Sequence, residues 1–222
     1  MDLIIVLGIL IIPTLAQFIV TSTYNKYKRV NNTIDLCGQE VARKILDDNK
    51  LEKIHVVSTS GTLSDHYDSA HNVIRLSNDI FNNNTVASVA IAAHECGHAI
   101  QDKEGYSFYR LRKMIYPVVR IGTMLSYAVI AIGAFAQLLN VIYIGIALVS
   151  LGLIFQLVTL PVEFDASKRA LEELKRLNLI NSDEESGVSK MLKAAAFTYV
   201  AGVLSSILEL LRLVMAFTNN RD

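Results

Sequence analysis

The stretch IGTMLSYAVIAIGAFAQLLNVIYIGIALVSLGLIFQLVTLPV, residues 121–162, contains no charged side chain. A helix needs roughly 20 apolar residues to cross the hydrocarbon core of a bilayer, so this stretch is about twice as long as one crossing requires. Mild turn formers around Asn140 divide it into two arms, at about 118–138 and 141–160. We therefore expect a transmembrane helical hairpin, and we assign residues 114–160 to it.

The composition agrees with a membrane protein. Hydrophobic residues make up 52% of the 222 residues, which is high for a soluble domain of this size. The 21 basic and 21 acidic side chains balance, so no charge excess favours nucleic acid, and we expect none as a partner. The run LIIVLGILIIPTLAQFIV within residues 1–25 predicts an N-terminal transmembrane helix.

Basic residues flank the predicted spans unevenly. They follow the first span and lie on both sides of the hairpin, whereas the hairpin tip has none; they are Lys26, Lys28, Arg29, Arg110, Arg112, Lys113, Arg120, Lys168, Arg169, Lys175 and Arg176. The positive-inside rule then places the amino terminus outside and both ends of the hairpin in the cytoplasm. We expect a multi-pass protein of the cytoplasmic membrane.

The C-terminal segment, residues 193–222, is less clear. Its apolar stretch contains Glu209 and Arg212, which are spaced to pair with each other on a helix. It is either a fourth transmembrane helix or a membrane-associated one, so the total is three to four spans.

Residues 26–113 form the main part outside lipid. The segment 34–48 has helical periodicity, and the segments 54–57 and 72–77 are typical of strands in a two-stranded ribbon. The segment 72–77 could be an exposed edge strand that pairs with an extended peptide. A further helical arm is expected over residues 161–192.

The helix that follows the ribbon, beginning near Asn84 or Thr85, carries the sequence HECGH at residues 94–98. In a helix, His94 and His98 share one face, so both imidazoles can bind a single Zn²⁺, with Glu95 placed as general base. The preceding residues are rich in alanine and valine, which indicates a buried helix, and Gly97 would let another backbone approach closely. The rival explanation is a chance cluster on a solvated helix.

Glu163 is the best candidate for the third protein ligand that a catalytic zinc needs. It heads an apolar stripe at helical spacing, formed by Ala166, Ala170, Leu174 and Leu177. A hairpin also returns the chain to the side of the two histidines. Asp165 is expected to pair with Arg169, or alternatively to support a zinc-bound histidine, and Glu172 is expected to pair with Arg176.

These residues and four longer stretches resemble the bacterial YugP-like membrane zinc metallopeptidases, and more distantly the HtpX-type and prenyl-protein (CAAX) membrane proteases. The stretches are GTLSDHYDSAHNVIRLS (61–77), VAIAAHECGHAIQD (89–102), VEFDASKRAL (162–171) and AFTYVAG (196–202). The resemblance implies His94, His98 and Glu163 as zinc ligands and Glu95 as catalytic base. Broader relatives usually have Asp four residues after the ligand Glu, where this chain has Ser167.

The expected fold is thus a mainly α integral membrane protein with a small α+β zincin-like catalytic unit on the cytoplasmic side. The expected function is that of a membrane-bound, zinc-dependent metalloendopeptidase acting on unfolded or membrane-proximal protein substrates. The alternatives are a non-hydrolytic, zinc-stabilised membrane scaffold or adaptor and, with less support, a transporter. Tyr199 and His66 are candidates for stabilising the oxyanion, and Cys37 and Cys96 are expected to be reduced thiols.

Overall fold

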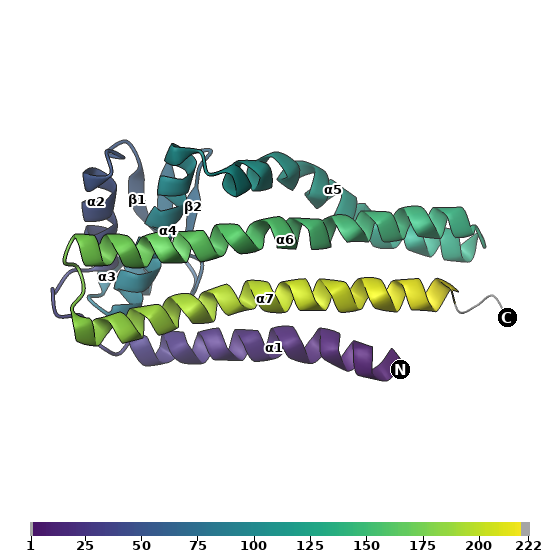
Figure 1. Cartoon of the computed structure of the whole chain (residues 1–222), viewed down its shortest axis with the longest axis horizontal. Coiled ribbons are helices and arrows are strands. Elements are labelled where there is room, and N and C mark those ends of the chain that lie inside the picture. The colour runs from purple at the N-terminus through teal and green to yellow at the C-terminus, as the bar shows by residue number, and fades with distance from the viewer. Residues whose placement is uncertain (1, 219–222) are drawn as a thin grey trace. The chain divides into compact units, whose positions relative to one another are not determined.

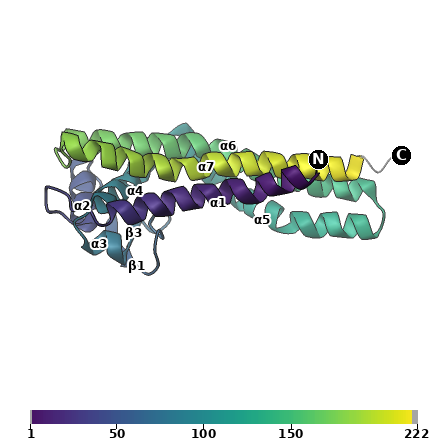
Figure 2. The same cartoon turned by 90° about the horizontal axis from the view of Figure 1, so that it is seen from below.

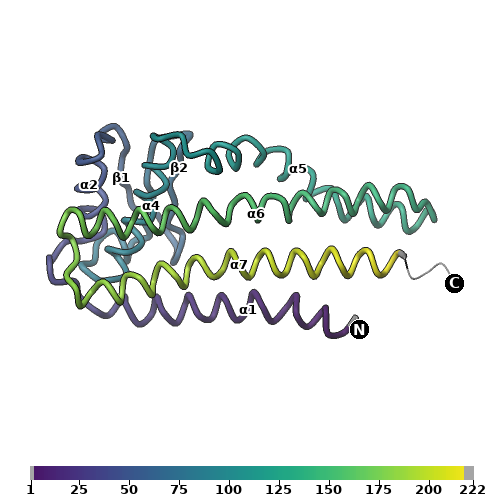
Figure 3. Tube along the Cα trace, in the orientation of Figure 1, coloured from purple at the N-terminus to yellow at the C-terminus, as the bar shows by residue number. Residues whose placement is uncertain are grey.

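The computed structural model describes residues 2–218 and is mainly helical, with one small sheet (Figures 1 and 3). Residue 1, at the start of the first predicted segment, and residues 219–222, at the end of the last one, lie outside the described residues. The elements are α1 (Asp2–Tyr27), α2 (Gly38–Asp48), β1 (His55–Thr59), β2 (His66–Asp68), β3 (Val73–Ser77), α3 (Asn78–Asn82), α4 (Val86–Glu104), α5 (Ser107–Phe135), α6 (Leu139–Arg176) and α7 (Ser182–Thr218).

The chain divides into two compact units. The helical unit comprises Met1–Gln17, Ser107–Pro161 and Thr198–Asp222. The mixed unit comprises Phe18–Tyr106 and Val162–Phe197, and it contains the sheet and helix α4. Helices α1, α6 and α7 each contribute residues to both units.

In the helical unit, α5 and α6 form the hairpin that the uncharged sequence predicts (Figure 2). The turn falls at residues 136–138, slightly before Asn140, and Gln137 adopts the left-handed conformation there with φ 54°. Glycines let the two helices approach closely: a Cβ added to Gly145 would lie 3.0 Å from the backbone nitrogen of Ile130. Such close approach is the usual basis of helix packing in membranes, where no hydrophobic effect drives association.

Four of the described helices are long and apolar enough to cross a membrane. The fourth is the C-terminal helix α7, which the sequence left undecided between spanning and lying at the membrane. The expected pair within it is present, since Arg212 Nη2 lies 2.7 Å from Glu209 Oε1. The Tyr127 hydroxyl also donates a hydrogen bond to Glu209 over 3.0 Å. Pairing of this kind lowers the cost of placing charges in an apolar helix.

The mixed unit has a three-stranded sheet in the order β1-β3-β2, not the predicted two-stranded ribbon. β1 and β3 pair in parallel, and β2 adds to β3 in antiparallel orientation. The prediction that residues 72–77 form an exposed edge strand is therefore wrong, because β3 is the central, largely buried strand. The apolar pattern of VIRLS in β3 reflects this burial. The sequence HYD of β2 is short and polar, so it does not indicate a strand.

Helix α4 packs against α6 at Gly97. A Cβ added to this glycine would lie 2.5 Å from the backbone oxygen of Ala166, so only glycine fits this contact. The predicted close approach at Gly97 is thus confirmed. The apolar stripe below Glu163 faces inward as expected, since Ala166, Ala170 and Leu174 are fully buried.

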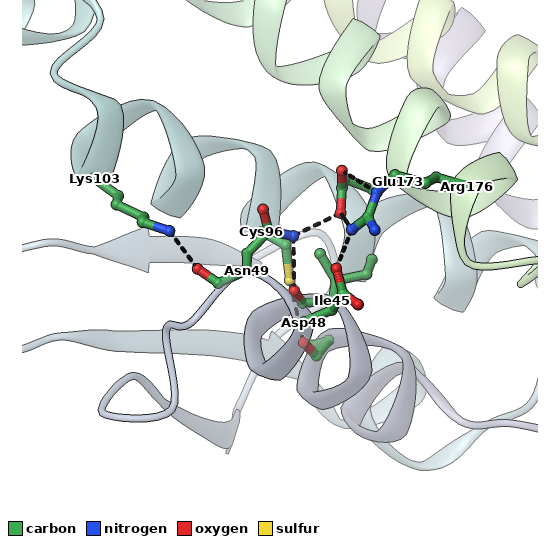
Figure 4. Close-up of polar contacts among 8 residues, drawn as sticks. Ile45, Asp48, Asn49, Cys96, Lys103, Glu173 and Arg176 are labelled. Carbon is green, nitrogen blue, oxygen red and sulfur yellow. Dashed lines mark hydrogen bonds and ion pairs between the residues drawn. The ribbon is translucent and has the colours of Figure 1, made fainter.

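Polar contacts near the end of α6 hold this helix to the end of α2, which in turn contacts α4 (Figure 4). The Asn49 amide donates to Glu173 Oε2 over 2.6 Å, and Lys103 donates to the Asn49 carbonyl over 2.6 Å. Arg176 pairs with Glu173 and with Asp48, so the predicted pair of Glu172 with Arg176 is wrong. Glu172 is exposed and pairs with Lys168 instead.

Candidate metal centre

Helix α4 carries the HECGH residues on a well-defined helix. Thr85 caps its amino end, where the Thr85 hydroxyl accepts a hydrogen bond from the backbone N–H of Ser88 over 3.2 Å. Gly105 ends the helix in the left-handed conformation with φ 67°. Local capping therefore sets both limits of α4, and its alanine and valine residues are buried, as the sequence predicts.

The structure brings His94, His98 and Glu163 together within the mixed unit. Glu163 Oε2 lies 3.3 Å from His94 Nε2 and 3.6 Å from His98 Nε2. The two imidazole rings meet edge to face, with their centroids 4.8 Å apart. The side chain of Glu163 is 2% exposed, and those of His94 and His98 are 13% and 10% exposed. One potential ligand atom from each residue thus lies close to the other two in a largely buried environment.

The donor set and the two separations from Glu163 fit zinc, and all three ligand atoms lie within 4.8 Å of one another. Zinc binds nitrogen and oxygen ligands at about 2.0–2.1 Å, so two ligands at tetrahedral positions lie roughly 3.3–3.4 Å from each other. The separations of 3.3 Å and 3.6 Å between Glu163 and the two imidazoles are close to this value. Two histidines and one glutamate also form a usual protein donor set for zinc with an open fourth position.

Glu95 follows His94 in α4 and is buried, with 7% of its surface exposed. Burial raises the pKa of Glu95 to about 7. The electrostatic interaction with His94 lowers the pKa of Glu95, whereas the interaction with the carboxylate of Glu163 raises it. The backbone of Tyr67 also hydrogen bonds to Glu95, which places edge strand β2 beside this carboxyl group.

Gln101 orients the ring of His98, a role that the sequence did not reveal. The Gln101 amide nitrogen donates to the Val162 carbonyl and to Asp165 Oδ2, each over 2.8 Å. Its oxygen is therefore the atom that faces His98 Nδ1, 3.0 Å away, and it accepts the Nδ1 proton. This leaves the Nε2 lone pair of His98 pointing towards Glu163, as metal binding requires.

The hydrogen-bonded chain continues from Gln101 to charged residues. Asp165 accepts a hydrogen bond from Arg169 Nε over 2.6 Å, so the predicted pair of these residues is confirmed. Arg169 also pairs with Glu104 of α4 over 2.6 Å. Asp165 reaches His98 only through Gln101, so its alternative role as a support for a zinc-bound histidine stays a prediction.

Ser167 takes the corresponding position beside His94. Its hydroxyl oxygen lies 3.3 Å from His94 Nδ1, which lets it accept the ring proton and free Nε2 for a metal. The helical spacing of Glu163 and Ser167, four residues apart, puts both on the face of α6 that contacts α4. The structure thus places Ser167 beside His94, at the position where the resemblance implies Asp.

The remaining candidate residues lie elsewhere. His66 is an exposed residue of β2, with Nδ1 2.8 Å from the Ser64 carbonyl, and Tyr199 belongs to the part of α7 in the helical unit. Their predicted role towards an oxyanion stays a prediction. His71 pairs with Asp68 over 2.7 Å, and Cys37 and Cys96 are free thiols, as expected.

The fold and the site together define a mainly helical protein with four candidate membrane spans and a His, His, Glu group that could hold a metal ion. The sequence profile of the family described as "Putative neutral zinc metallopeptidase" matches residues 2–218, so the chain belongs to this family. The chain is also 44% identical to the "Putative membrane protease YugP" of Bacillus subtilis (strain 168), over 93% of this chain and 92% of that protein. No solved structure matches the chain.

Proposed function

We propose that the chain is a membrane-bound, zinc-dependent endopeptidase, with zinc held by His94, His98 and Glu163 and with Glu95 as general base. The observation that carries this proposal is the convergence of three ligand atoms, from two helices far apart in sequence, beside a buried fourth carboxyl group. A site with three protein donors leaves a position for reactants, as catalytic zinc sites do.

The residues divide the chemistry between them. A zinc ion bound by these residues would act as a Lewis acid, which makes water nucleophilic near neutral pH and polarises a peptide carbonyl. Glu95 accepts one proton from the attacking water as its oxygen bonds to the carbonyl carbon, and it delivers that proton to the leaving amine nitrogen. Gln101 and Ser167 hold the two imidazoles in the tautomer that presents Nε2.

The alternative of a non-hydrolytic scaffold, stabilised by zinc, is less well supported. Structural zinc sites are usually closed and rich in cysteine. Here the buried Cys96 thiol faces the Ala42 carbonyl at 3.6 Å, and Cys37 precedes α2, so neither belongs to the donor set. A scaffold would also leave the buried carboxyl group of Glu95 without a role, although burying such a group costs free energy.

The position of β2 at the edge of the sheet favours a substrate in extended conformation. It borders β3 on one side only, and its residue Tyr67 contacts Glu95 through the backbone. An unfolded or membrane-proximal peptide could add to the outer edge of β2 by backbone hydrogen bonds and so pass the site.

We also propose, from the positive-inside rule, that the site faces the cytoplasm at a bacterial cell membrane.

Cleavage of an unfolded model protein by the purified, zinc-loaded chain in detergent tests the proposal. Glu95→Gln should abolish cleavage and leave zinc content unchanged, because the amide cannot take a proton. The matched control is Glu52→Gln, which alters an exposed glutamate and should cleave like the wild type. Equal cleavage by wild type and Glu95→Gln would favour the scaffold or a different base.

A further inference from the structure

A second feature of the mixed unit is a groove of about 500 Å³ between α1 and α7. No residue of the candidate metal centre lines it. Each helix contributes one face, at spacings of three, four and seven residues. The residues that matter below are Ile19, Lys26 and Tyr27 of α1 and Lys190, Lys193 and Phe197 of α7.

One end of the groove is strongly cationic. Lys26, Lys190 and Lys193 are exposed and line it together, whereas no carboxylate does. Within residues 2–218, none of the three forms an ion pair. Lys28 differs, since its ammonium group lies 3.8 Å from Asp79. Three ammonium groups without a carboxylate repel one another, and an anion between them would remove that repulsion.

The other end of the groove is apolar. Ile19 lies two helical turns before Lys26, and Phe197 lies two turns after Lys190, a length of about 10 Å on each helix. Ile19 and Phe197 are 41% and 42% exposed, which leaves their side chains open to a ligand. Both walls thus change from apolar to cationic in the same direction, α1 towards its carboxyl end and α7 towards its amino end.

The two helices are packed together at this groove. A Cβ added to Gly187 of α7 would lie 2.8 Å from Cε1 of Tyr27, so the glycine permits close contact between the walls. The ring of Tyr27 is buried and also lies 5.3 Å from the Lys26 ammonium group. This contact holds Lys26 beside the groove.

We propose that this groove binds the phosphate headgroup of an anionic phospholipid, with the start of an acyl chain along Ile19 and Phe197. Both helices are candidate membrane spans, and the groove lies where the apolar run of α1 ends in Lys26. Lysines at this position lie at the depth of lipid phosphates, to which basic residues are attracted. An apolar wall that leads to three ammonium groups matches both parts of such a lipid.

Native mass spectrometry of the full-length, zinc-loaded protein in detergent, titrated with phosphatidylglycerol or phosphatidylcholine, tests the proposal. The wild type should prefer phosphatidylglycerol. The combined variant Lys26→Gln, Lys190→Gln, Lys193→Gln should bind it on the order of a hundredfold more weakly. The control Lys44→Gln, Lys50→Gln, Lys53→Gln removes the same charge from exposed positions outside the groove and should bind like the wild type.

Three results would overturn the proposal: no preference of the wild type for the anionic lipid, equal binding by the groove variant, or an equal loss in the control. Displacement of phosphatidylglycerol by inorganic phosphate would also overturn it, because the groove would then be a site for free phosphate. Unchanged zinc content and circular dichroism show that the variants are folded. The single variants Lys190→Gln and Lys193→Gln, each expected to weaken binding, replace the combined variant if it does not fold.

Discussion

The carboxylate of Glu163 is buried at the first turn of an apolar stripe, where an unpaired charge would cost several kcal/mol. Its neighbours are two imidazoles whose outer nitrogens are each matched to an acceptor, Gln101 for His98 and Ser167 for His94. The inner nitrogens are therefore free to face Glu163. A dication at this point would satisfy all three residues at once, which is why they fit a metal better than a purely protein-bonded cluster.

Replacing Glu163 tests its part in the metal centre. Glu163→Gln keeps the shape of the side chain but removes its charge and weakens it as a ligand. We expect zinc affinity, measured by competition with a chelator, to fall by roughly a hundredfold or more, since even supporting residues of zinc sites contribute about 10–100-fold. Glu172→Gln, on an exposed part of the same helix, should have no effect. Full affinity in Glu163→Gln would identify another third ligand.

Gln101 should influence zinc without touching it. Gln101→Met fills a similar volume but cannot accept the Nδ1 proton of His98 or donate to Val162 and Asp165. We expect zinc affinity to fall about 10–100-fold. Gln39→Met, at an exposed position of α2, serves as the control. If both variants keep wild-type affinity, the hydrogen bond does not orient His98.

At the scale of elements, the centre depends on the contact between α4 and α6. The two helices are separated by many residues, and the backbone of Ala166 lies against Gly97, between the two histidines of α4 in sequence. The contacts of Asn49, Glu173 and Arg176 fix the far end of the same arm of α6. The distance from Glu163 to the histidines is therefore set by backbone packing as much as by the ligands themselves.

A methyl group at Gly97 should separate these helices. In Gly97→Ala the new Cβ would lie 2.5 Å from the Ala166 oxygen, and such overpacking typically costs about 1–3 kcal/mol. We expect a lower melting temperature and reduced zinc content in detergent. In Gly152→Ala the Cβ would meet only Thr123 Cγ2, at 3.4 Å, so this control should lose neither. Wild-type zinc content and stability in Gly97→Ala would show that the helices can adjust.

The elements also explain how far the sequence could be interpreted. Helical periodicity, which is local, predicts the shared face of the histidines and the place of Glu163 at the head of an apolar stripe, and the missing Cβ of Gly97 predicts the close approach there. The order of the sheet does not, because pairing of β1 with β3 brings a third, short strand to the edge and depends on contacts distant in sequence. The role of Gln101 was missed for the same reason: its spacing from His98 was visible, but its partners Val162 and Asp165 lie about sixty residues further on.

At the scale of the whole molecule, the arrangement of spans decides which side of a membrane carries the centre. An even number of crossings between them would put α4 and the arm of α6 on the same side of the membrane, and by the positive-inside rule the flanking basic residues predict that this side is the cytoplasm. A fourth crossing by α7, which is long and apolar enough, would place the carboxyl terminus outside.

Cysteine labelling in intact cells tests this topology. In a background with Cys37→Ser, Asn140→Cys at the start of α6 should react with a membrane-impermeant maleimide added from outside. Lys53→Cys, an exposed position of the mixed unit, should react only after the cells are opened. The reverse pattern would put the centre outside the cytoplasm.

The zinc X-ray absorption spectrum of the purified, full-length protein tests the central claim most directly. We predict one zinc per chain, bound by two imidazoles and by oxygen at about 2.0–2.1 Å, with no sulfur ligand. Loss of one imidazole contribution in His98→Ala would connect the spectrum to this site. A spectrum with sulfur ligands at about 2.3 Å, or a protein that binds no zinc, would contradict the account.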